Sequence, residues 1–154
     1  EGIIDSICKS YGDNGEFLSI GGREIKNPFM DKSISKYQYL DMDGSEIFKF
    51  ATSSVISSIK DILQKNNMTI DDIDYIVPHQ ANVRIIEYVA KKLKTSMDKF
   101  YMNIDTYGNT SSASIPLALN EMYNKGILQK GQNLLLVGFG GGLTYGSCLI
   151  KWSI

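Results

Sequence analysis

The chain alternates between short apolar runs and longer stretches in which apolar residues recur every three or four positions. Short apolar runs bounded by turn residues predict strands, whereas the three-to-four spacing predicts helices that bury one face. Strands are therefore expected at residues 2–8, 17–20, 73–77, 100–104, 134–139 and 143–152. Helices are expected at residues 45–65, 80–93 and 112–124. Strands that alternate with helices indicate an α/β domain, spanning residues 1–154, with a mostly parallel sheet under helical cover.

The three predicted helices differ in how their apolar residues are arranged. The first two carry an apolar stripe on one face, and Asp43 or Ser45 is expected to cap the first of them. In the third helix, apolar residues wrap most of the circumference, which predicts burial on nearly all sides. A sheet of this size covers one side of a helix, so we expect further protein on the other side. Residues 21–44 are polar and lack a clear period, and we expect a long surface loop there.

Composition narrows the class of protein. A net charge of −1 argues against a general nucleic-acid binder, which would carry a strong basic excess. Cys8 and Cys148 are too few for a disulfide framework and fit a reducing cytoplasm. One histidine and two scattered cysteines give no metal-ligand spacing, so no metal site is expected. No apolar run reaches the length of a membrane span, and no signal-peptide pattern opens the chain.

Three turns carry the candidate chemistry. His79 follows the strand at 73–77, Asn109 follows the strand at 100–104, and Gly140–Gly142 joins the last two strands. Polar side chains at the carboxyl ends of strands lie where open α/β sheets place their ligands. Each turn also has a structural interpretation: a satisfied histidine, an asparagine that caps a turn, and a glycine hairpin.

Basic residues gather on one side of the second predicted helix. Arg84, Lys91 and Lys92 fall on nearly the same side because seven residues almost complete two turns, and Lys94 extends the group. Such a face is either solvated or a docking surface for an acidic partner or a phosphate group.

The three turns lie within longer motifs that together resemble one enzyme family. The motifs are Val-Pro-His-Gln-Ala-Asn at 77–82, Gly-Asn-Thr-Ser-Ser-Ala-Ser at 108–114 and Phe-Gly-Gly-Gly-Leu-Thr-Tyr-Gly-Ser at 139–147. In this order and at these spacings they resemble the carboxyl-terminal half of β-ketoacyl-acyl-carrier-protein synthase III. This family contains the initiating condensing enzymes of bacterial type II fatty acid synthesis and belongs to the thiolase-like superfamily.

The resemblance implies a thiolase-like half with a mixed five-stranded sheet and both buried and outer helices. Family members consist of two similar halves, and intact members are homodimers. Their nucleophilic cysteine belongs to the amino-terminal half, which this chain lacks. We therefore expect the chain alone to be inactive in condensation.

The resemblance also assigns roles at the active site. The family's histidine and asparagine match His79 and Asn109, which supply two members of a Cys-His-Asn triad. The backbone amide of Gly141 would help bind an oxyanion, and Phe139 would form a wall of the acyl pocket. The reaction would use acyl-coenzyme A and malonyl-acyl carrier protein, with no metal or bound cofactor.

Further positions are implied at the entrance to the site. Asn82 and Ser45 are candidates to line the tunnel for the pantetheine arm. The acidic carrier protein is expected to dock on basic side chains at Arg84, Lys49, Lys91 and Lys92. Other functions stay open at this point: a cysteine hydrolase or acyltransferase using Cys8, a thiolase-like acyltransferase of secondary metabolism, and a carrier-binding module without catalysis.

Overall fold

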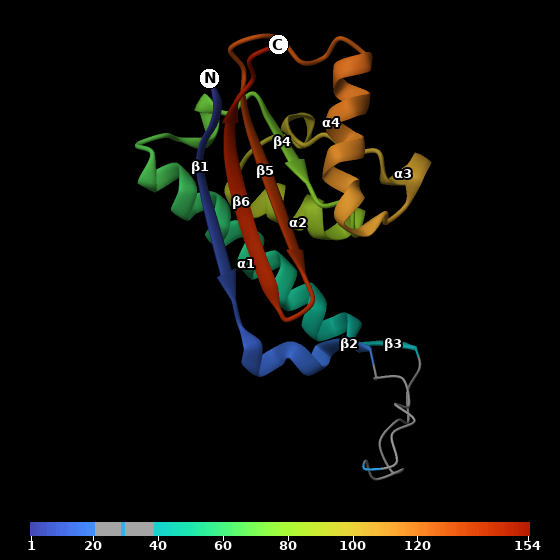
Figure 1. Ribbon diagram of the computed structural model, residues 1–154. Coiled ribbons are helices and arrows are strands. Elements are labelled where there is room, and N and C mark those ends of the chain that lie inside the picture. The colour runs from blue at the N-terminus through green and yellow to red at the C-terminus, as the bar shows by residue number, and fades with distance from the viewer. Residues whose placement is uncertain (21–28, 30–38) are drawn as a thin grey trace.

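A mixed four-stranded sheet forms the centre of the described chain (Figure 1). The structure is a computed structural model, and it describes residues 1–20, 29 and 39–154. The strand order is β1-β6-β5-β4, with bounds Gly2–Ser10 for β1, Thr144–Lys151 for β6, Asn133–Gly140 for β5 and Tyr75–Pro78 for β4. β1 and β5 both run antiparallel to β6, whereas β4 and β5 are parallel, so the prediction of a mostly parallel sheet is wrong. The carboxyl ends of β4 and β5 therefore lie side by side at the same end of the sheet.

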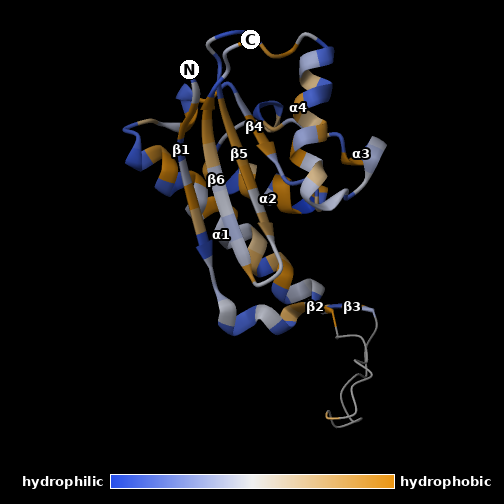
Figure 2. Cartoon of the chain, in the orientation of Figure 1, coloured by the Kyte–Doolittle hydropathy of each residue, from blue (hydrophilic) through white to orange (hydrophobic). Residues whose placement is uncertain are grey.

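Helices cover both faces of this sheet. α1 (Gly44–Lys65) and α2 (Val83–Leu93) pack on one face, where Ile59, Val89 and Leu135 belong to one buried cluster. α4 (Ser114–Asn124) lies on the opposite face, where Met122 and Leu134 belong to a second cluster (Figure 1). Figure 2 shows the hydrophobic colour along most of β5, as expected for a strand with helices on both sides.

Short helical turns connect the main elements. α3 spans Ile104–Tyr107, and the 3₁₀ turns are η1 (Gly12–Phe17), η2 (Ile70–Asp72), η3 (Met97–Lys99) and η4 (Ser111–Ala113). At η2, the backbone amide and the hydroxyl of Thr69 both donate to Oδ2 of Asp72, at 2.7 and 2.8 Å, and these bonds close the turn.

Capping side chains define where the long helices begin. The Asp43 carboxylate accepts hydrogen bonds from the amides of Ser45 and Glu46, both at 3.0 Å, so Asp43 rather than Ser45 caps α1. Asn82 accepts from the amide of Arg84 at 2.9 Å and caps α2. The second helix thus begins at Val83, three residues later than predicted.

The prediction of a five-stranded sheet is wrong in one element. Residues 100–104 form a single parallel bridge, between Phe100 and Ile76, and no strand. The amide of Tyr101 still donates to the carbonyl of Ile76 at 2.9 Å. Beyond that point a buried side chain, Gln80, takes over the backbone partners, as described below.

The predicted second strand lies outside the main sheet. β2 (Leu18–Ile20) pairs with β3 (Leu40–Met42) in a separate two-stranded sheet. The prediction of a loop over residues 21–44 is therefore wrong at residues 40–42, and residues 21–28 and 30–38 lie outside the described part of the chain.

α4 buries one face rather than nearly its whole surface. Ser114, Ala118 and Met122 are buried, whereas Ile115, Leu117 and Leu119 are only half-buried. Within the described residues, the sheet is the main structure against which this helix packs.

Candidate active site

A cavity of about 910 Å³ lies at the carboxyl edge of β4 and β5. His79, Asn109 and Gly141, which come from the three turns singled out in the sequence, all line it. Phe139 and Asn82 line it as well. The fold therefore brings together side chains that are up to 62 residues apart in the sequence, because parallel strands end at the same edge.

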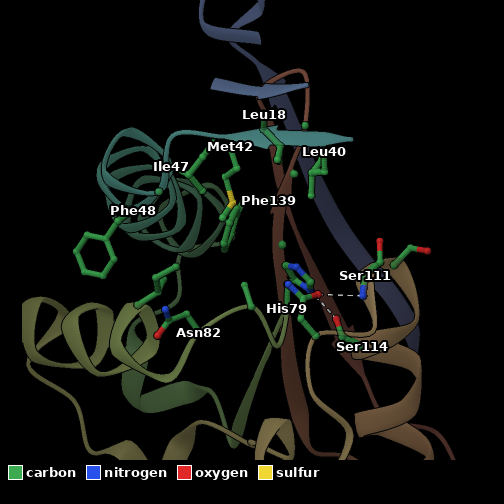
Figure 3. A pocket seen from close by; sticks show the side chains of 18 of the residues that line it. Leu18, Leu40, Met42, Ile47, Phe48, His79, Asn82, Ser111, Ser114 and Phe139 are labelled. Atoms are coloured by element: carbon green, nitrogen blue, oxygen red, sulfur yellow. Dashed lines mark hydrogen bonds between the residues drawn. The ribbon is translucent and has the colours of Figure 1, made fainter. Parts of the chain in front are cut away.

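The imidazole of His79 is fixed from three sides. Its backbone amide donates to the carbonyl of Val137 at 2.8 Å, which extends the β4–β5 ladder by one residue. The ring nitrogen Nδ1 lies 2.6 Å from Oγ of Ser114 (Figure 3). The edge of the ring meets Phe139, with ring centroids 5.5 Å apart. Burial lowers the pKa of His79 below its ordinary value, so the ring is neutral near pH 7.

A glycine of β5, Gly138, lies beside His79. A Cβ atom on Gly138 would lie 3.8 Å from Cβ of His79 and 3.7 Å from Cδ1 of Ile115. A larger side chain at this position would therefore compete with the imidazole for the space between β5 and α4.

Asn109 lines the cavity, and its amide oxygen is held by a neighbouring backbone group. Its Oδ1 atom accepts a hydrogen bond from the amide of Ser111 at 3.0 Å. Among the described side-chain hydrogen bonds, none uses the Nδ2 group of Asn109. The backbone around it is unusual, since Gly108 has φ of 68° and Ser111 has φ of 55°. The oxygen is thus anchored locally, and the N–H groups stay available as donors.

The glycine turn between β5 and β6 forms another part of the cavity wall. Gly142 has φ of 115°, a conformation that favours glycine. The Thr144 hydroxyl donates to the carbonyl of Gly141 at 3.1 Å and holds the turn. A Cβ atom on Gly141 would lie 3.7 Å from the carbonyl oxygen of Leu18, so β2 approaches this turn closely.

Apolar side chains form most of the remaining wall. Leu18 and Leu40 come from the β2–β3 pair, and Phe48 comes from the start of α1 (Figure 3). Met42 and Ile47 complete this side. A cavity that is largely apolar but holds a few convergent donors is suited to a small organic ligand with one polar reactive group.

The two predicted tunnel residues have different positions. Asn82 lines the cavity, but its Oδ1 atom is occupied as the cap of α2. Ser45 is exposed on the first turn of α1 and is absent from the cavity wall, where its neighbour Gly44 lies instead.

The predicted docking residues lie outside the cavity. Arg84, Lys91 and Lys92 are exposed on α2, and the Lys92 ammonium lies 5.4 Å from the ring centre of Tyr88. Lys49 is on α1 and pairs with Glu46 at 2.6 Å. The two helices meet through Phe48 and Tyr88, whose ring centroids are 6.1 Å apart. The sequence analysis passed over Glu87, which lies between Arg84 and Lys91 on the same side of α2 and reduces the positive charge there.

Neither cysteine takes part in the cavity. Cys8 is exposed on β1, and Cys148 is half-buried on β6. Burial raises the pKa of the Cys148 thiol, which weakens it as a nucleophile. Both thiols are free, and neither lines the wall that holds His79 and Asn109. The hypothesis of a hydrolase that uses Cys8 with these two residues therefore lacks the required geometry.

Two residues that support the site were not recognised in the sequence. Ser114 is 2% exposed and contacts His79, and Gln80 is 1% exposed and bonds to residues 101–103. A serine and a glutamine are common surface residues, so no pattern in the sequence distinguished them. Their place inside the motifs at 77–82 and 108–114 was the only available signal.

Other kinds of site find no support in the described residues. No group of three or more His, Cys, Asp or Glu side chains lies close enough there to hold a metal ion. None of the described helices combines the length and apolarity that a membrane crossing requires.

A mixed α/β sheet whose edge carries a histidine, an asparagine and a glycine turn around one apolar cavity is the arrangement of a thiolase-like carboxyl-terminal half. Residues 63–152, more than half of the chain, match the family model described as 3-oxoacyl-[acyl-carrier-protein (ACP)] synthase III C terminal. The chain belongs to this family. The resemblance stated from the motifs is thereby confirmed.

Individual relatives agree with this assignment. The β-ketoacyl-[acyl-carrier-protein] synthase III of Clostridium novyi is 53% identical over 152 residues, which cover 99% of this chain and 47% of that protein. The crystal structure of the synthase III from Thermus thermophilus superposes with a TM-score of 0.86 at 34% identity, covering 98% of this chain and 46% of that one. The enzyme from Pseudomonas aeruginosa gives 0.85 at 34% identity, with 99% and 44% covered. The chain spans about half the length of the curated relatives that it matches.

Proposed function

We propose that this chain is the carboxyl-terminal half of a β-ketoacyl-acyl-carrier-protein synthase III, an acyltransferase that starts fatty acid synthesis. The observation that carries the proposal is the convergence of His79, Asn109 and Gly141 on one apolar cavity. In the reaction, a cysteine of the amino-terminal half takes an acyl group from acyl-coenzyme A as a thioester. Malonyl-acyl carrier protein then loses carbon dioxide, and the resulting carbanion attacks that thioester.

His79 and Asn109 would stabilise the charge that decarboxylation creates. Loss of carbon dioxide places negative charge on the thioester oxygen of an enolate, and hydrogen-bond donors aimed at that oxygen lower the barrier. Asn109 has free N–H groups, since its oxygen is anchored by Ser111. His79 is neutral near pH 7 and can donate through one ring nitrogen without changing its charge. The Gly141 amide would serve the second oxyanion, which forms when the carbanion attacks the acyl-cysteine.

The wall of the cavity fits the rest of the substrate. Phe139 borders the imidazole and would confine the acyl group, and Met42 and Phe48 offer an apolar surface to the pantetheine arm. Asn82 would contribute to this channel through its amide nitrogen, because its oxygen caps α2. Ser45, outside the wall, would act no nearer than the mouth of the channel.

The carrier protein would dock beside the cavity on the exposed basic residues of α2. Arg84 directly follows Val83 at the start of the helix, next to the cavity residue Asn82. Lys91 and Lys92 would extend the surface, and Lys49 would join it at the cost of its pairing with Glu46. The two free thiols fit a reducing, cytoplasmic setting, and the intact enzyme would be a homodimer like other members of the family.

The proposal is tested by reconstitution. The chain is expressed with an amino-terminal half that carries the nucleophilic cysteine, and condensation of acyl-coenzyme A with malonyl-acyl carrier protein is measured. The joined halves are expected to be active and the chain alone inactive. Replacement of one donor, His79→Ala or Asn109→Ala, should reduce decarboxylation by about 10²–10³-fold, equivalent to about 2.7–4 kcal/mol.

A matched replacement gives the control, because Asn124→Ala removes the same amide at the end of α4, outside the cavity wall. This variant should retain its rate. Condensation by the chain alone, or full activity in both donor variants, would refute the proposed function.

A further inference from the structure

Ser114, the first residue of α4, is in direct contact with the imidazole of His79. Its Oγ atom lies 2.6 Å from Nδ1 of His79 (Figure 3). The residue is 2% exposed, so water does not compete for its hydroxyl group. The contact joins two elements that are 35 residues apart, the end of β4 and the start of α4.

The surroundings of Ser114 determine which of the two groups donates. Oγ of Ser114 also accepts from the backbone amide of Gln80, at 3.4 Å. Among the hydrogen bonds of the described residues, Nδ1 of His79 is the only acceptor within reach of the serine proton. If Nδ1 carried a proton and donated it, the buried hydroxyl would accept twice and its own proton would be unpaired. Ser114 therefore donates, and Nδ1 accepts.

This direction fixes the proton on the imidazole. A neutral imidazole carries one proton, so an Nδ1 atom that accepts requires that Nε2 be protonated. A half-turn of the ring about its Cβ–Cγ bond would place the carbon Cδ2, which is no acceptor, against the hydroxyl of Ser114. The contact with Ser114 and the edge-to-face packing on Phe139 therefore keep Nδ1 in its place. With Nδ1 turned toward the interior, Nε2 is left for the cavity that His79 lines.

We propose that Ser114 is a positioning residue that holds His79 as the neutral tautomer protonated on Nε2, so that one N–H group faces the cavity. Its importance for catalysis depends on the proposed function, in which that N–H group and the Asn109 amide bind the same enolate oxygen. The state of the imidazole itself can be tested without any assay of activity.

Nuclear magnetic resonance reads this state directly, because His79 is the only histidine of the chain. Long-range ¹H–¹⁵N correlation spectra of the ¹⁵N-labelled chain are recorded at about pH 8, well above the ordinary pKa of histidine. The wild-type spectrum should show a single neutral ring with Nε2 protonated and Nδ1 unprotonated. In Ser114→Ala the hydroxyl is lost, and a second population with the proton on Nδ1 should appear. Ser114→Thr retains a hydroxyl and should restore the wild-type pattern.

A control variant separates this effect from a general disturbance of the cavity. Ser112→Ala removes a hydroxyl that lines the same cavity without contacting the imidazole in the described hydrogen bonds, and it should leave the ring spectrum unchanged. A wild-type ring protonated on Nδ1, or a Ser114→Ala spectrum identical to wild type, would overturn the proposal. The wild-type spectrum decides even if Ser114→Ala does not fold. Absence of condensation in the reconstituted enzyme would count against the proposed function and would leave the spectroscopic result unaffected.

Discussion

His79 lines the cavity, but the protein around it removes much of its solvent. This desolvation determines the charge of the ring. The ring is half-buried against Phe139 and Ser114, and desolvation disfavours the charged form. A histidine that remained charged would present a full cation to the cavity and would have no pair of electrons for Ser114. Its neutral state follows from packing, which the sequence motif alone does not reveal.

The lowered pKa of His79 predicts how stability depends on pH. The folded chain binds this proton less tightly than the unfolded chain, whose histidine has a pKa of about 6.5. The contribution of His79 is therefore complete above that value and is lost as the pH falls through it toward the folded pKa. Wild type should thus lose more stability between about pH 7.5 and pH 5 than His79→Gln does. Urea unfolding of both proteins at the two pH values measures the difference.

Two carboxylates, Asp5 and Asp72, also make stability depend on pH, but equally in wild type and His79→Gln. Hydrogen bonds from Lys65 and Thr69 lower the pKa values of Asp5 and Asp72, respectively. Their stabilising contributions are present in both proteins and are lost only at more acidic pH. An equal loss of stability in wild type and His79→Gln would show that the histidine is not desolvated in the folded chain.

At the level of elements, Gln80 explains why the predicted strand at 100–104 does not form. Its Nε2 group donates to the carbonyls of Pro78 and Tyr101 at 2.9 and 3.1 Å, and its Oε1 atom accepts from the amide of Asn103 at 3.1 Å. The side chain thus occupies the place of a neighbouring strand. It provides hydrogen-bond partners for the backbone of Tyr101 and Asn103, in the segment that leads to Asn109. It connects the His79 turn to residues 101–103.

Replacement of this side chain should therefore be costly. Gln80→Met retains the length but removes the partners of two carbonyls and one amide, and each buried polar group left unpaired costs about 1–3 kcal/mol. We expect the free energy of unfolding to decrease by about 2–4 kcal/mol, with faster hydrogen exchange at the amide of Asn103. Gln64→Met on the exposed side of α1 is the matched control and should change stability by less than about 0.5 kcal/mol. Equal stability of the two variants would contradict the role of Gln80.

The elements that were predicted correctly share one property. In elements such as α1 and β5, the spacing of apolar residues follows from which face is buried. This spacing can be read from the local sequence alone. β3 is three residues long and exposed, so it carries no such period. The strand at 100–104 was apolar enough to be predicted, but its partner was a side chain. For the site, His79 could be placed because the end of its strand was visible. Asn109 was placed from the end of a strand at 100–104 that the structure lacks, and Ser114 depends on a tertiary contact.

At the level of the whole molecule, the polar groups of the candidate site and the exposed charges of α2 lie in different places. Donors gather inside the cavity, whereas exposed charges lie on the outer face of α2 beside it. Glu87 lies within this basic surface and would oppose the attraction of an acidic partner there. Charges at the rim of an interface mainly affect the rate of encounter and its dependence on salt.

This separation predicts opposite effects for two substitutions on α2. Arg84→Glu should slow association with acyl carrier protein several-fold and weaken its dependence on salt, whereas Glu87→Lys should accelerate it. Lys60→Glu changes the charge equally on an exposed site of α1 and should have little effect. Stopped-flow or surface-binding measurements at two salt concentrations give the rates. An Arg84→Glu variant that associates as fast as Lys60→Glu would rule out docking on this surface.

The pairing of β1 with β6 has a consequence for biosynthesis. Gly2 pairs with Lys151, and β6 lies between β1 and β5 in the sheet. Synthesis proceeds from the amino end, so β1 leaves the ribosome long before its neighbour β6. Leu18 cannot come to rest beside Gly141 until the turn that follows β5 has been synthesised. We expect nascent chains arrested before β6 to expose β5 on its open side, and only chains that include β6 to acquire protease resistance.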